Sequence, residues 1–117
     1  MSTDQAGAAT DVGPDYRNEV LLRGRLAAAA ESRELPSGDV LVTFRVIVDR
    51  ARADGERLRV DTIDCTAWTA RVQRSAVAWQ PGDRVEVGGA LRRRFRRAAE
   101  GATSRVEVEV LRARRLR

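Results

Sequence analysis

With 117 residues and a formal charge of +5, the chain is long enough for one domain with one core, but not for two. It has no His and a single Cys, Cys65, so the commonest general base and the commonest metal ligand are both missing, and an enzyme is the least favoured class. No secretory signal and no apolar run of membrane-spanning length is visible, so we expect a cytoplasmic binding protein without cofactor or metal.

Arginine supplies all 22 basic residues, and Lys is absent. A GC-rich coding bias explains this composition as well as a functional demand does, and composition alone leaves both explanations open. Either way, a guanidinium can donate two hydrogen bonds to one phosphate and can stack on aromatic rings, so it suits nucleic acid better than an ammonium group does.

Residues 1–16 are small, polar and without periodicity, which predicts a disordered N-terminal tail ahead of one folded domain over residues 17–117. The tail carries three aspartates and no base. The positive charge of the chain is therefore concentrated in the folded part.

The first predicted strand covers Asn18–Leu26, with Val20, Leu22 and Leu26 on one face. Gly24 lies on the same face and predicts a sharp bend or a close backbone approach, as in a strand that serves both halves of a closed barrel. The segment that follows meets Pro36-Ser37-Gly38, so we expect a loop with a short edge strand there.

The second predicted strand covers Asp39–Asp49, and its alternation places Phe44 in the core. Asp54-Gly55 then predicts a hairpin turn. The arginines of residues 50–57 belong either to a solvated loop or to a flexible basic finger.

The third predicted strand covers Leu58–Trp68, with Cys65 as a small buried hydrophobe. Trp68 falls on the polar face, where a lid over the sheet and a base-stacking platform are equally good interpretations. Residues 70–79 carry apolar side chains at helical spacing and predict a short helix, with Trp79 plugging the bottom of the barrel.

The stretch Pro81–Arg97 begins with a Pro-Gly turn and continues as an alternating strand, with Val85, Val87, Gly89 and Leu91 on one face. It ends in five arginines around Phe95. We expect Ala98–Ser104 to form a Gly/Ala loop, and Arg105–Leu111 to form the last strand with Val106 inward and Glu107 and Glu109 outward.

Three strands, a helix and two strands make an all-β chain in the order of a five-stranded OB-fold, a Greek-key barrel with one short helix between strands 3 and 4. Such barrels bind oligonucleotides across strands 2 and 3 and the loops 1–2 and 4–5. The predicted binding residues are arginines and rings on these elements: Arg45, Arg52, Arg57, Arg59, Trp68, Arg92, Arg94, Phe95, Arg96 and Arg97. A solvated, composition-driven Arg run is the alternative.

Four runs of residues occur in a familiar order: NEVLLRGRL, LPSGD, DCTAW and PGDRVEVGGALRRRF. Together they resemble bacterial single-stranded DNA-binding proteins (SSB), particularly the short, Arg-rich actinobacterial kind. The resemblance implies sequence-independent binding of single-stranded DNA in replication, repair and recombination, association with the nucleoid, and a homo-oligomer, either a tetramer or a dimer.

The resemblance also implies roles for single positions. Trp68 matches a stacking aromatic at the end of strand 3, Arg94 matches a basic residue of strand 4, and Phe95 or Arg96 falls where another ring is usual. Arg52 and Thr62 stand where the family often has Trp. Asp64 stands where a base is common, which works against phosphate binding.

The sequence ends in arginines, whereas family members usually continue into a Gly/Pro-rich linker and an acidic tip that recruits other enzymes. We therefore expect no acidic recruitment tip here. Two alternative functions stay open: RNA binding by the same groove, and a degenerate module that acts through protein partners, for example in a mixed assembly with a full-length SSB. Thr62, Asp64 and an exposed Glu107/Glu109 edge favour the protein-binding alternative.

Overall fold

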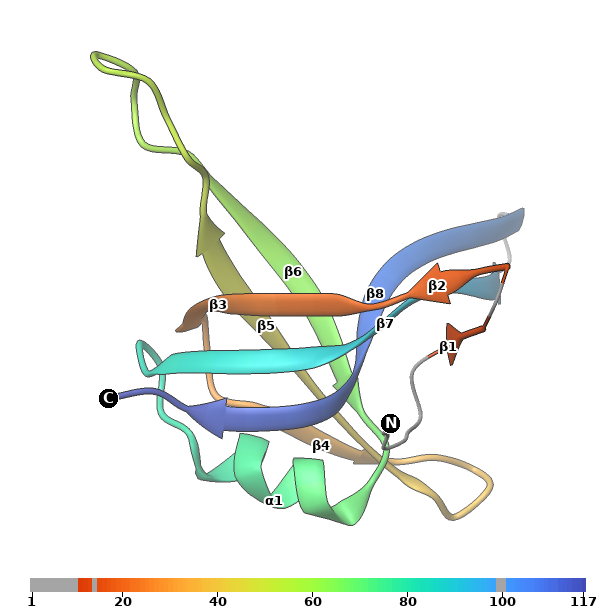
Figure 1. Cartoon of the computed structure of the whole chain (residues 1–117). Helices are drawn as coiled ribbons and strands as arrows, with labels where there is room; N and C mark the ends of the chain where they lie inside the picture. Colours follow the sequence, from red (N-terminus) through yellow and green to blue (C-terminus); the bar gives the residue numbers. More distant parts are fainter. Residues whose placement is uncertain (1–10, 14, 99–100) are drawn as a thin grey trace.

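The computed structural model describes residues 11–13, 15–98 and 101–117, and its main body is a closed β-barrel (Figure 1). The barrel strands and the helix between them follow the predicted order: β3 (Val20–Leu26), β5 (Val40–Asp49), β6 (Val60–Ala67), α1 (Ala70–Ala78), β7 (Arg84–Ala98) and β8 (Gly101–Arg115). The predicted five-stranded OB-fold with one helix is therefore confirmed.

Closure of the barrel depends on β3. The strands are hydrogen-bonded in the order β3-β7-β8-β6-β5, and β3 also pairs with β5 through Arg25 and Leu26. Gly24 lies where β3 turns from one partner to the other, and a Cβ atom there would collide with the carbonyl group of Ile47. The close approach predicted for this glycine is confirmed.

The core is built mainly from alternating valines of the barrel strands, and it continues onto α1 through Val72 and Ala76. Phe44 and Trp79 are both buried and meet edge to face, with ring centroids 5.5 Å apart. Both rings are therefore core residues, as strand alternation predicted for Phe44 and helical spacing for Trp79.

Helix α1 begins where the sequence predicts it and packs against β5, β6 and β8 at one end of the barrel (Figure 1). The hydroxyl of Thr69 accepts a hydrogen bond from the backbone N–H of Val72, which satisfies one of the free donors of the first turn.

Three short strands of the described chain lie outside the barrel. Strand β4 (Glu31–Glu34) pairs with β5 at the edge of the sheet and confirms the predicted edge strand. Strand β1 (Asp11–Val12) pairs with β2 (Arg17–Asn18). Most of the predicted N-terminal tail, residues 1–10, lies outside the described residues.

The prediction of a Gly/Ala loop over Ala98–Ser104 is wrong. Strand β7 continues to Ala98 and β8 starts at Gly101, and the two strands stay paired up to these residues in a long extension, here called the arm (residues 91–98 and 101–106) (Figure 1). The reason is cross-strand pairing, in which opposite charges and hydroxyls face each other: Arg92 opposes Glu107, and the guanidinium of Arg93 donates to the hydroxyl of Ser104. The Arg-rich stretch is therefore strand rather than loop.

Leu91 keeps its predicted face but is not buried. The β7–β8 register shifts between Gly88 and Gly89 because Leu111 is an extra residue on β8, and beyond this bulge Val110 opposes Gly89 and Val108 opposes Leu91. Val108 is buried in the core, whereas Leu91 lies at the start of the arm and is 47% exposed.

Smaller differences concern the ends and faces of β6 and β8. Strand β6 starts at Val60 rather than Leu58, and β8 continues to Arg115 rather than ending at Leu111. Val106 is exposed because it lies on the arm, beyond the barrel core. Thr66 shares the polar face of Trp68 by alternation, but it is buried, and its hydroxyl donates to the carbonyl of Val108.

Candidate nucleic-acid interface

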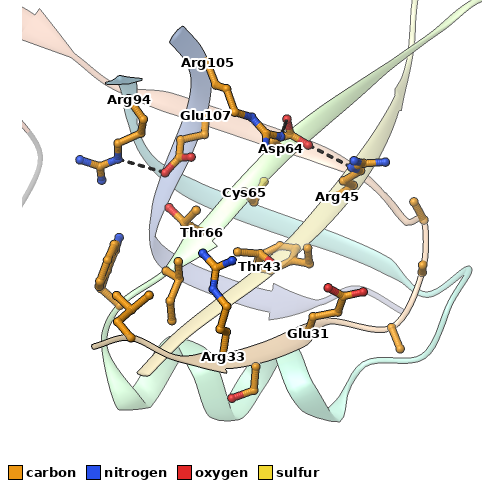
Figure 2. A pocket seen from close by; sticks show the side chains of 18 of the residues that line it. Glu31, Arg33, Thr43, Arg45, Asp64, Cys65, Thr66, Arg94, Arg105 and Glu107 are labelled. Carbon is orange, nitrogen blue, oxygen red and sulfur yellow. Dashed lines mark hydrogen bonds and ion pairs between the residues drawn. The ribbon is translucent and has the colours of Figure 1, made fainter. Parts of the chain in front are cut away.

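A groove with a volume of about 780 Å³ crosses the outer face of the barrel (Figure 2). Its floor is formed by β5 and β6. One wall is the segment from Ala27 to Leu35, which includes β4, and the other is the base of the arm. These are the strands and connections across which the sequence predicted binding.

Two aromatic rings line the groove from different elements. Trp68 follows directly after β6 and is 38% exposed, and Phe95 lies on the arm and is 75% exposed. Because an exposed ring can stack on a base without displacing core contacts, both rings are available to a ligand. This exposure favours the platform interpretation of Trp68 over the lid.

The predicted binding arginines fall into separate regions. Arg45 and Arg94 line the groove. Arg52, Arg57 and Arg59 belong to the β5–β6 connection, here called the finger (residues 50–59), and do not line it. Arg92 does not line it either, and its Nε donates to Glu109 over 2.9 Å. The side chains of Arg96 and Arg97 lie outside the described part of the chain.

Three of the groove arginines, Arg45, Arg94 and Arg105, have carboxylate partners within the protein. Arg45 Nε donates to Asp64 over 3.0 Å, and a terminal nitrogen of Arg105 donates to the other oxygen of Asp64 over 2.7 Å (Figure 2). On the arm, Arg94 Nε donates to Glu107 over 3.2 Å. Ion pairs therefore cross the groove from β5 to β6 and β8.

These contacts act on the protonation of Asp64. Hydrogen bonding from Arg105, with a smaller contribution from Arg45, lowers the pKa of Asp64 below its usual value despite partial burial. Asp64 is thus a carboxylate at neutral pH and holds two guanidiniums at once.

Two groove arginines were missed by the sequence analysis, Arg33 and Arg105. Arg105 was assigned only as the start of a strand. Arg33 lies in a short polar segment without periodicity, and only its pairing opposite Leu41 places it on the groove wall. Among the described residues, Arg33 has no ion-pair partner, in contrast to Arg45, Arg94 and Arg105.

The predicted exposed edge at Glu107 and Glu109 is wrong. Their side chains are only 12% and 22% exposed, because Arg92 and Arg94 lie across them. This removes one of the observations that favoured a protein-binding module.

Cys65 is buried beneath the groove, as predicted, and its burial raises the pKa of the thiol to about 12. Within the described residues, no three side chains of the metal-ligating types come together. The helix of the described chain is too short to cross a membrane.

Comparisons with known proteins agree with this fold. A sequence model of the single-strand binding protein family matches residues 17–116. Single-stranded DNA-binding protein B of Bacillus subtilis is 31% identical over 96 residues, which are 80% of this chain and 83% of that protein. The single-stranded DNA-binding protein of Bacillus cereus is 34% identical over 86 residues, or 72% of this chain, and the matched part is 50% of that relative's length.

A solved structure described as a Plasmodium falciparum SSB complex with ssDNA superposes with a TM-score of 0.77 at 18% identity, covering 91% of this chain and all of that chain. At that identity the likeness shows the fold alone, and it confirms the barrel. The family match, in contrast, covers nearly all of the described chain. The chain therefore belongs to the single-strand binding protein family.

Proposed function

We propose that the protein binds single-stranded DNA, without catalysis and with little sequence preference, along the groove between β4 and the arm. The observation that carries this proposal is the pair of exposed rings, Trp68 and Phe95, on the walls of a groove that also presents four arginines. Family membership supports the same function.

Recognition in this proposal has two parts. Bases stack on Trp68 and Phe95, at roughly 1–3 kcal/mol per base, and any base can do so because every base has a π-face. Phosphates contact the guanidiniums of the groove, first that of Arg33, which has no carboxylate to share within the described structure. Arg45, Arg94 and Arg105 contribute the N–H groups that their carboxylate partners leave free.

Fluorescence titration with a dT oligomer at two salt concentrations tests this function. If a protomer contacts about four phosphates, log K falls with log salt at a slope near −3, from ~0.7 per phosphate. A duplex of the same length serves as the control. Equal affinity for duplex and single strand at the same salt would contradict the stacking account.

A competition between poly-dT and poly-U in the same assay separates DNA from RNA as the ligand, since the rings and guanidiniums of the groove can bind either one. We propose DNA because the family relatives bear that name. Preferential displacement by poly-U would reverse this assignment.

We also propose that the protein is a homo-oligomer, as the family resemblance implies. The outer face of β3, β7 and β8 supports this, since Leu21 is exposed there beside a shallow hollow lined by Gly88 and Arg112. Mass measurement in solution tests it, and co-purification with a full-length SSB tests a mixed assembly. A monomeric mass across the concentrations used for DNA binding would contradict the homo-oligomer.

A further inference from the structure

The groove is rich in arginine but nearly neutral. Its described lining holds the arginines 33, 45, 94 and 105 and the acids 31, 64 and 107, so four positive charges face three negative ones. Figure 2 shows the acids among the arginines rather than apart from them. A phosphate that enters this groove therefore meets carboxylates as well as guanidiniums.

Asp64 is the central acid of this arrangement. It lies on β6 between Arg45 of β5 and Arg105 of β8, bonded to both at 3.0 Å and 2.7 Å, with a third of its side chain exposed. Glu107 is the second acid, bonded to Arg94 and 12% exposed. Each carboxylate already occupies guanidinium N–H groups that a phosphate oxygen would otherwise accept from.

These carboxylates weaken one part of DNA recognition and leave the other unchanged. Binding of a polyanion by charge alone depends on the number of phosphates neutralised, and each internal carboxylate reduces that number. Stacking on Trp68 and Phe95 needs only a free base face and does not depend on those charges. A single strand offers free base faces, whereas a duplex keeps those faces stacked and offers none to Trp68 or Phe95.

On this basis, and given the proposed function, we infer that Asp64 and Glu107 are specificity-determining residues. They suppress binding of phosphate backbones as such, and so make the groove prefer single strands with accessible bases over duplex DNA and other polyanions. The two acids act by weakening the binding of duplex DNA and other polyanions, not by adding a contact with single-stranded DNA.

The test compares Asp64→Asn and Glu107→Gln with wild type for three ligands: a dT oligomer, a duplex of equal length, and heparin, a polyanion without bases. For Asp64→Asn we expect about 3- to 10-fold tighter binding of duplex and heparin, as one negative charge beside the bound polyanion is removed. The salt slope for duplex steepens by about 1 for each additional phosphate contact. Affinity for dT rises less, so the ratio of dT to duplex affinity falls.

Asp49→Asn is the matched control, because Asp49 also pairs with an arginine, Arg25 at 3.1 Å, but neither lines the groove. This variant should leave the ratio of dT affinity to duplex affinity unchanged. An unchanged dT-to-duplex ratio in both groove variants, or weaker dT binding by Asp64→Asn, would overturn the inference. Circular dichroism checks folding, and if Asp64→Asn misfolds, Glu107→Gln decides.

Failure of the proposed function gives a different result. A wild-type protein that binds dT no better than duplex contradicts the proposed function itself. A wild-type protein that prefers dT, with groove variants that keep the same preference, contradicts only the role of the acids.

Discussion

The groove and the finger are equally rich in arginine, but their charges are used differently. In the groove, Arg45, Arg94 and Arg105 are held by carboxylates of neighbouring strands. In the finger, a carboxylate holds only one of the four described arginines, since Arg50 pairs with Asp61 at 2.8 Å. Arg57 and Arg59 have no ion-pair partner among the described residues, and Arg52 donates to a backbone carbonyl. The number of arginines in a stretch therefore does not measure the charge that the stretch offers to a ligand, because cross-strand acids neutralise some of them.

The aromatic rings distinguish the two regions further. The groove has Trp68 and Phe95, and the finger has no ring at all. We therefore assign base stacking to the groove, and to the finger at most a general attraction for phosphate.

Removing both groove rings should have the largest effect. In Trp68→Ala/Phe95→Ala we expect a loss of dT affinity of at least about 30-fold, since each stacked base contributes roughly 1–3 kcal/mol. Fluorescence anisotropy with labelled dT measures it. Tyr16→Ala is the control, because Tyr16 is exposed but does not line the groove. If the double variant binds as the control does, stacking takes place elsewhere.

Single arginines test which region contacts the phosphates. Arg33→Ala should weaken dT binding several-fold and reduce the magnitude of the salt slope by ~0.7, the share of one phosphate. Arg57→Ala, the matched change in the finger, should reduce affinity less, because no ring holds a strand against the finger. Titrations at several salt concentrations give both slopes. A larger loss of affinity in Arg57→Ala than in Arg33→Ala would assign the contacts with DNA phosphates to the finger.

Lowering the pH should show how much Asp64 contributes to the stability of the fold. Arg105 makes the pKa of Asp64 lower in the folded than in the unfolded protein. The contribution of Asp64 to the free energy of unfolding is therefore complete above the unfolded-state pKa, and it is lost as the pH falls through the folded-state pKa. We expect the free energy of unfolding to decrease below about pH 4, and to decrease less in Asp64→Asn. Glu86, held by Arg23 and Arg114, shifts in the same direction, so the difference between the two proteins isolates Asp64. Urea unfolding at several pH values measures the free energy of unfolding of both proteins. If it decreases with falling pH equally in wild type and Asp64→Asn, the stabilising role of Asp64 is contradicted.

The smallest effect concerns Cys65, beneath the groove floor. Burial raises its pKa to about 12, so the thiol is protonated and shielded, and we expect almost no reaction with a thiol reagent at about pH 8 in the folded protein. Full reactivity should appear in denaturant. A rapid reaction of the native protein would mean that the groove floor opens to solvent.

Local patterns determined much of the fold. Alternation of valines marked the barrel strands and put Phe44 in the core, because the side chains of a strand point to opposite faces in turn. Gly24 marked the turn of β3 between its two partners, and the Pro81-Gly82 turn and the helix came where local propensity predicts them. These features need only neighbouring residues to be recognised.

Other features were decided by contacts between distant segments. The arm forms because β7 and β8 stay paired beyond the barrel, and the bulge at Leu111 shifts the phase of β8 opposite Gly88 and Gly89. Arg33 reached the groove only through the pairing of β4 with β5.

The same division holds for the binding site. Rings and arginines could be assigned to an OB-fold groove from the sequence alone, because the order of strands places Arg45, Trp68 and Phe95 there. Which arginines are already paired follows from the tertiary structure. Asp64 and Arg105 are 41 residues apart and meet because β6 and β8 lie side by side, and neither residue carries a local signal of that contact. The charge that the groove offers to a ligand is thus a property of the folded barrel.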